Sequence, residues 1–148
     1  MVYSSESIGT SVIQSLLDTN WDDNEGNIPK PLLLEATSVE PRLNLSVEGD
    51  DVIIIRSEDA GIQENWRDHY AYADWTVFIR VEIYTIASRQ RLYDLMQEVR
   101  RIIRAQKHNV GAYQLARYVS FSELTQEQLN FWAGFCRISL ESKGIYIG

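Results

Sequence analysis

One cysteine and two histidines are the residues of this sequence best suited to covalent or acid–base catalysis. Cys136 is the candidate nucleophile, and His69 and His108 are the candidate general bases. Cys136 lies in the middle of a predicted strand, between Phe135 and Arg137, whereas His69 lies in a predicted loop and His108 follows a predicted helix. No histidine is near the cysteine in sequence. We therefore interpret Cys136 as a buried structural residue and predict that the protein is not an enzyme.

An acidic segment, Asp22 to Glu25, precedes Gly26 and invites comparison with a calcium-binding loop, because calcium prefers clustered oxygen ligands. If Gly26 takes the sixth loop position, however, Trp21 takes the first and Leu32 the twelfth, where carboxylates are required. A solvated acidic loop is the better interpretation. A single cysteine also excludes an internal disulfide and a zinc site of several thiolates, and the sequence has no glycine-rich phosphate loop. We therefore expect neither a metal nor a cofactor.

The first half of the chain predicts one helix and two strands. Residues 7–18 place isoleucine, valine and leucine at helical spacing, and residues 32–36 form a short predicted strand. Residues 52–55 are a run of β-branched side chains and predict a strand inside the sheet. Residues 57–73 show no sustained period and carry aromatic side chains among charged ones, so we expect an exposed loop or hairpin extension there.

The second half predicts a long strand, a helix and two further strands. Residues 75–86 alternate, which assigns one face of the strand to the core, and the core-facing residues are Trp75, Val77, Ile79, Val81 and Ile83. Ser88 is placed to cap an amphipathic helix that runs to about Gln106. A break follows at residues 109–111, then strands near residues 115–121 and 131–141 with a helical turn from Thr125 between them, and a small tail from Gly144.

This order of elements predicts an α+β fold in a single domain that spans residues 1–148. We expect a mainly antiparallel sheet of about four to five strands with two helices packed on one face. A chain of 148 residues has the usual length of one compact domain and can bury roughly two-thirds of its unfolded surface. A core can therefore form without disulfides or metals.

Charge is divided unevenly along the chain, whose net charge is −7. Residues 1–74 hold 15 of the 21 acidic residues and 4 of the 14 basic ones, whereas residues 75–148 hold 6 and 10. An acidic protein is poorly suited to bind nucleic acid, because that affinity depends on neutralised phosphates. Opposite charge on the two halves favours association between unlike surfaces, including head-to-tail contact between identical chains.

Nine residues are candidates for a subunit or partner interface. Three belong to the helix predicted to follow Ser88, and two to the second face of the 75–86 strand. Four belong to the 57–73 segment, where tyrosine and tryptophan suit interface centres. They are Arg100, Arg101, Arg104, Trp66, Arg67, Tyr70, Tyr72, Arg80 and Glu82. For the arginines the alternatives are simple solvation or protein contact, with nucleic acid a distant third. For the aromatics the alternative is folding back over the sheet.

The segments DVIIIR, WTVFIRVEIYTI, SRQRLYDLMQEVRRIIR and YVSFSELTQEQLNFWAGFCRISLES occur in an order that resembles the tail terminator, or tail-completion, proteins of long-tailed bacteriophages and related viruses. The resemblance covers most of the chain and is strongest over residues 74–107. It implies an α+β subunit of a ring, generally a hexamer, that caps the tail tube to stop its growth and offers a docking face to the head-side connector. It assigns no individual interface residue.

The resemblance also implies partners and a place. The expected partners are further copies of the chain, the tail tube protein and the head-completion or connector protein, in the neck region of a virion assembled in the host cytoplasm. No signal peptide and no apolar run of about 20 residues is present, so we expect no membrane partner. The alternatives are a neck connector between portal and tail, a monomeric adaptor that binds protein through residues 57–73, and a small enzyme acting through Cys136 or His69.

Overall fold

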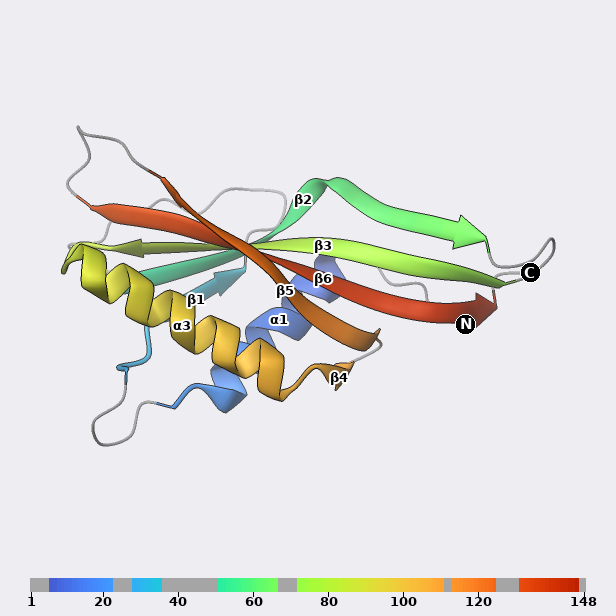
Figure 1. Cartoon of the computed structure of the whole chain (residues 1–148), viewed down its shortest axis with the longest axis horizontal. Helices are drawn as coiled ribbons and strands as arrows, with labels where there is room; N and C mark the ends of the chain where they lie inside the picture. Colours follow the sequence, from blue (N-terminus) through green and yellow to red (C-terminus); the bar gives the residue numbers. More distant parts are fainter. Residues whose placement is uncertain are drawn as a thin grey trace.

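The computed structural model describes residues 6–22, 28–35, 51–66, 72–110, 113–124 and 131–146 of the chain. This part of the chain forms two helices and six strands (Figure 1). The elements, in chain order, are α1 (Glu6–Asn20), β1 (Leu32–Glu35), β2 (Asp51–Trp66), β3 (Tyr72–Thr85), α3 (Arg89–Ala105), β4 (His108–Val110), β5 (Tyr113–Leu124) and β6 (Trp132–Tyr146).

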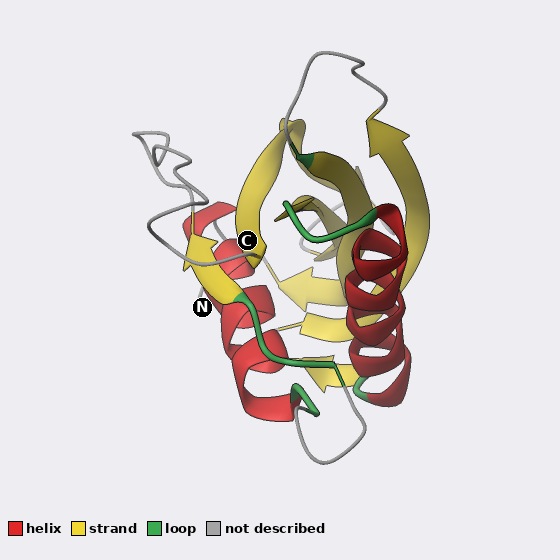
Figure 2. Ribbon diagram, turned by 90° about the vertical axis from the view of Figure 1, so that its left-hand side faces the viewer, coloured by secondary structure: helices red, strands yellow, loops and turns green. Residues whose placement is uncertain are grey.

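The strands form one sheet in the order β1-β2-β3-β6-β5-β4. Only β1 pairs in parallel, with β2, and the other pairs of neighbouring strands are antiparallel. Both helices lie on the same side of this sheet (Figure 2). The expected α+β class, with a mainly antiparallel sheet and two helices on one face, is therefore confirmed.

The core lies between the two helices and the sheet. Four of the five β3 residues expected to face it are fully buried, namely Val77, Ile79, Val81 and Ile83; the side chain of Trp75 lies outside the described part. The apolar side of α3 packs against them through Leu92, Leu95, Val99, Ile102 and Ile103. Each buried aliphatic side chain of this kind contributes about 1.5–3 kcal/mol to folding before entropy is counted.

The start of α3 is fixed by contacts that a short stretch of sequence can predict only in part. Ser88 is the N-cap, as expected, because its side chain accepts a hydrogen bond of 3.1 Å from the backbone N–H of Arg91. The side chain of Arg91 then pairs with Asp51 at 2.6 Å, which joins the start of α3 to the start of β2. The helix orientation on the sheet is thereby tied to a residue 40 positions away.

Residues 57–66 form the second half of β2, and its last residues pair with β3 as in a hairpin; residues 67–71 of the 57–73 segment lie outside the described residues. Gln63 pairs with Thr76 and Trp66 with Ala73, after a bulge that begins at Ser57. Here β6 supplies a third strand, because its last residues pair with the start of β3. We call residues 58–66, 72–75 and 142–146 the arm. The arm extends beyond both helices along the long axis of the molecule (Figure 1).

Three expectations for the second half need comment. The break expected at residues 109–111 is wrong in part, because His108–Val110 form the short strand β4, held by pairing with β5. The tail expected from Gly144 is also wrong, since β6 continues to Tyr146 by pairing with β3. In both places strand pairing overrides a local turn signal: β4 pairs with β5, the next strand along the chain, and the end of β6 pairs with the distant start of β3. The helical turn expected from Thr125 lies outside the described residues.

Candidate functional site

The candidate nucleophile Cys136 is fully buried in β6 and faces the helix-covered side of the sheet. Its Sγ accepts a hydrogen bond from the hydroxyl of Tyr118 at 3.6 Å. Burial raises the pKa of the thiol to about 12, so the reactive thiolate is not formed near neutral pH. His108 lies exposed in β4, and His69 falls outside the described residues. The position of Cys136 fits the structural role expected for it.

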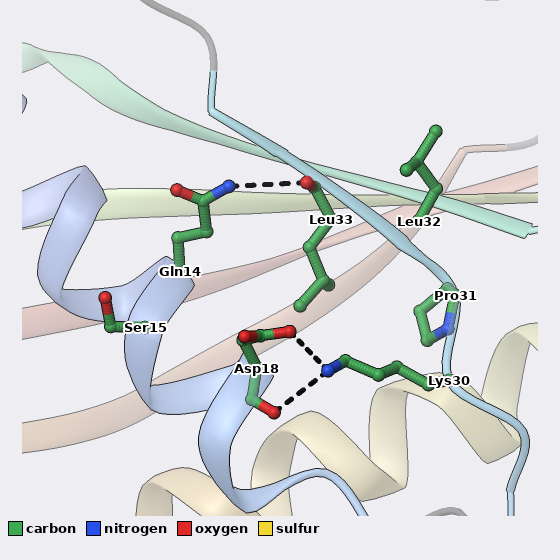
Figure 3. Close-up of a pocket in the computed structure, with 7 residues that line it drawn as sticks. All are labelled: Gln14, Ser15, Asp18, Lys30, Pro31, Leu32 and Leu33. Atoms are coloured by element: carbon green, nitrogen blue, oxygen red, sulfur yellow. Dashed lines mark hydrogen bonds and ion pairs between the residues drawn. The ribbon is translucent and has the colours of Figure 1, made fainter.

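A pocket of about 380 Å³ lies between α1 and β1 (Figure 3). Its polar groups are already used to hold the two elements together: Gln14 donates to the backbone carbonyl of Leu33 at 3.3 Å, and Lys30 forms an ion pair with Asp18. The seven residues that line it include neither histidine nor cysteine. Within the described ranges, no group of three or more histidine, cysteine, aspartate or glutamate side chains could hold a metal ion. The polar groups of this pocket therefore serve to hold α1 against β1, and they are not arranged for catalysis.

Three arginines stand side by side on the face of the sheet opposite the helices. Arg56 of β2 pairs in register with Arg80 of β3, which pairs in turn with Arg137 of β6. We call these three the arginine row. Glu82, also on β3, approaches Arg56 at 2.9 Å and Arg80 at 3.0 Å. One buried carboxylate thus partly neutralises a row of three cations.

Aromatic rings and a phenol complete this surface. The guanidinium of Arg80 lies 4.0 Å from the ring centre of Phe135, and that of Arg137 lies 4.2 Å from the ring centre of Phe78. The hydroxyl of Tyr84 donates to Glu82 at 3.1 Å. Burial, followed by the charge of Glu82, raises the pKa of Tyr84 to about 12. Cation–π stacking and ion pairing together hold the arginine row in a fixed arrangement.

The three arginines expected at an interface on α3 do not share one role. Arg101 donates to Glu98 at 2.5 Å and to the backbone carbonyl of Asn20 at 2.9 Å, and Glu98 accepts the backbone N–H of Asp22 at 2.8 Å. Arg101 therefore fastens the end of α1 to α3. Arg100 and Arg104 are exposed. Reversal of all three charges would confuse loss of an interface with loss of this internal contact, so tests of an interface must leave Arg101 intact.

A second groove, of about 360 Å³, runs between the C-terminal end of α3 and the strands β4 and β5. Its floor is apolar and its rim is basic. The residues that line it are Ile103, Arg104, Lys107, His108, Leu115, Ala116, Arg117 and Tyr118. We call it the α3–β5 groove. Arg104 and Lys107 are exposed, and within the described residues neither side chain forms a hydrogen bond or an ion pair.

Seven of the nine interface candidates lie in three places. Arg80 and Glu82 come together on the face of the sheet opposite the helices, where Glu82 is buried and directed to its own neighbours. The α3 arginines lie on the opposite, helix-covered side. Trp66 and Tyr72 lie on the strands of the arm. The remaining two, Arg67 and Tyr70, fall outside the described residues, as does most of the acidic loop that follows Asp22.

Sequence reasoning missed most of both surfaces. Arg56 and Arg137 join Arg80 only through strand register, which no local pattern encodes. Arg117 and Tyr118 reach the groove because β5 runs beside the end of α3. One signal was present, since Lys107 ends the run of basic residues that marked the helix.

The sequence matches no model of a known protein family, and a search of curated proteins found no match either. Among the described residues, neither helix is long and apolar enough to cross a membrane. The function must therefore be argued from the arrangement of the chain itself.

Proposed function

We propose that this chain is a structural virion protein that forms a ring on the end of a tail tube, stops tube elongation and offers a docking face to the head-side connector. The proposal begins from the resemblance of residues 74–107 and of the closing strands to tail terminator proteins. The ring is expected to contain six copies. The proteins it contacts are further copies of itself, the tube protein and the connector.

One observation carries the proposal: acidic and basic groups lie on different parts of one body. The arm segments of β2 and β3 hold four acidic positions and no basic one, whereas exposed cations lie at the end of α3 and beside it in β5. Two unlike patches on a single subunit form a heterologous interface, and such interfaces close into rings when the rotation between copies permits. Opposite charge then selects the correct patch and speeds the encounter.

The arrangement of candidate catalytic groups supports a structural role. A thiol that is buried and has a raised pKa is unsuited to nucleophilic attack, and the α1–β1 pocket contains carboxyl and amine groups that already neutralise one another. A rigid sheet braced by two helices is instead well suited to transmit contacts between neighbours.

Two measurements test the proposal. Native mass spectrometry of the purified chain should give one closed oligomer of defined mass. Electron microscopy of tail tubes from the virus that encodes the chain should then show added density at one end, and tubes assembled in its presence should be shorter than those assembled without it. A chain that stays monomeric at high concentration and leaves tube ends bare would contradict the proposal. Rings that bind the portal-side complex but ignore tubes would assign the chain to the neck connectors instead.

A further inference from the structure

The α3–β5 groove and the arm are complementary in charge, and we propose that the arm of one copy occupies the α3–β5 groove of the next copy. This inference rests on the proposed ring and names the contact that builds it. The occupant is a second copy of this chain, rather than an unrelated peptide or a nucleic acid. The inference follows from the groove, the arm and the direction in which the arm extends.

The groove has the features of a site for an acidic, partly apolar segment. Ile103, Leu115 and Ala116 line its floor, with the half-buried ring of Tyr118 beside them. Arg104 and Lys107 stand on its rim and form no ion pair within the described part of the chain. Unpaired cations beside an apolar floor favour a ligand that brings carboxylates at its edges and an apolar or aromatic residue at its centre.

The arm has the matching composition. Its β2 and β3 residues include four acidic positions and no basic one; the acidic positions are Glu58, Asp59, Glu64 and Asp74. Its third strand, from β6, adds Lys143, so these three segments together have a net charge of −3. The same strands carry Trp66 and Tyr72, the residue types that most often anchor protein interfaces. The arm therefore combines acidic charge, which complements the basic rim of the groove, with aromatic side chains.

The arm of one copy cannot bind in the groove of the same copy. The arm is a continuation of β2, β3 and β6, fixed by strand pairing on both sides of β3. It points away from the helices, whereas the groove lies beside the end of α3 (Figure 1). Folding the arm back would break this pairing. The contact must therefore be made between copies, with the arm of each entering the groove of its neighbour, which is the head-to-tail pattern of a ring.

The arginine row is the weaker candidate for the same partner. Its charge is already reduced by Glu82, and two of its members are stacked on phenylalanine rings. Arg104 and Lys107 of the groove have no such partner in the described residues. An incoming carboxylate therefore gains more by entering the groove than by approaching the sheet.

The first test neutralises the rim of the groove with Arg104→Gln and Lys107→Gln, which lowers the net charge of the chain by two. The matched control is Ser15→Glu with Thr19→Glu, which makes the same change in net charge at exposed positions of α1. We expect the groove variant to need about tenfold more protein for half-assembly, measured by light scattering, and the control to assemble like the parent. Circular dichroism verifies that both variants are folded. Equal assembly of the groove variant and the parent would overturn the inference.

The second test exchanges the charges. A groove-reversed chain carries Arg104→Glu and Lys107→Glu, and an arm-reversed chain carries Glu58→Lys and Glu64→Lys. Each alone should remain unassembled, because arm and groove then repel. Mixed together, they should form oligomers that contain the two chains in equal number, and a chain carrying all four substitutions should assemble by itself. Failure of both rescues, with every chain folded, would overturn the inference.

These outcomes are separable from the failure of the proposed function. Rescued rings that do not alter tail tubes would uphold the arm–groove contact and reject the tail terminator role. Rings that cap tubes whether or not the substitutions are present would uphold the tail terminator role and reject the arm–groove contact. If the groove-reversed chain assembles normally but loses retention on duplex DNA, the groove is a nucleic-acid site and the inference is wrong.

Discussion

Replacement of Glu82 by alanine tests how the face of the sheet opposite the helices is held together. The carboxylate of Glu82 is buried and lies 2.9 Å from Arg56 and 3.0 Å from Arg80, and it accepts a hydrogen bond of 3.1 Å from Tyr84. Alanine removes all three contacts at once. It also leaves Arg56 and Arg80, which are paired in register, as like charges on neighbouring strands.

The size of the effect follows from how much water reaches the arginines. Breaking a fully buried ion pair by removing one partner costs about 3–5 kcal/mol. Here the side chains of Arg56 and Arg80 remain 24% and 34% exposed, so water recovers part of the lost interaction. We therefore expect Glu82→Ala to lower the free energy of unfolding by about 2–3 kcal/mol.

Glu141→Ala is the matched control, since it removes a glutamate near Arg117 at 3.6 Å, and that arginine is 59% exposed. We expect a loss of about 0–1 kcal/mol for this variant. Urea unfolding measures both variants at one protein concentration, chosen low enough that light scattering shows each as a monomer, because assembly would otherwise add to the apparent stability. If the two losses differ by less than about 0.5 kcal/mol, stacking on the phenylalanine rings, rather than Glu82, holds the arginine row.

Three further predictions follow from single contacts. Gly134→Ala places a Cβ 2.6 Å from the ring of Phe121 and 3.0 Å from a backbone carbonyl, and should lower the free energy of unfolding by about 1–3 kcal/mol in urea titrations. Cys136 should resist iodoacetamide at pH 8 in the folded chain and react only in denaturant, as mass spectrometry would detect, because burial raises its thiol pKa to about 12. The pKa of Tyr84 is raised from 10.0 to about 12, so the folded state retains its proton where the unfolded chain has lost it. Stability should therefore fall as pH rises through that window, and thermal unfolding of Tyr84→Phe should show a shallower decline.

Local patterns in the sequence predicted the elements that bury one face. The alternation of Val77, Ile79, Val81 and Ile83 identified the buried face of β3, and the spacing of apolar residues after Ser88 identified α3 with its N-cap. These predictions depend on periods of two and about 3.6 residues, which the backbone geometry imposes on any strand or helix. The α+β class then followed from the order of the elements.

Periodicity of apolar residues could not predict where the long strands end. Residues 58–66 have no sustained apolar alternation, and they belong to β2 because residues 62–66 pair with β3 beyond the bulge. The last residues of β6 continue to Tyr146 for the same reason, despite Gly144. Pairing with a neighbouring strand supplied the backbone hydrogen bonds that the local sequence did not predict.

The sequence by itself determined the buried stripes, the class of fold and the division of charge between the two halves. Only the tertiary structure decided which charged residues meet. Strand register placed Arg56, Arg80 and Arg137 in one row, and the packing of β5 beside α3 placed Arg117 near Lys107. A periodic pattern reports what one segment presents to its surroundings, whereas a surface built from several segments depends on their pairing, and pairing is a property of the whole chain.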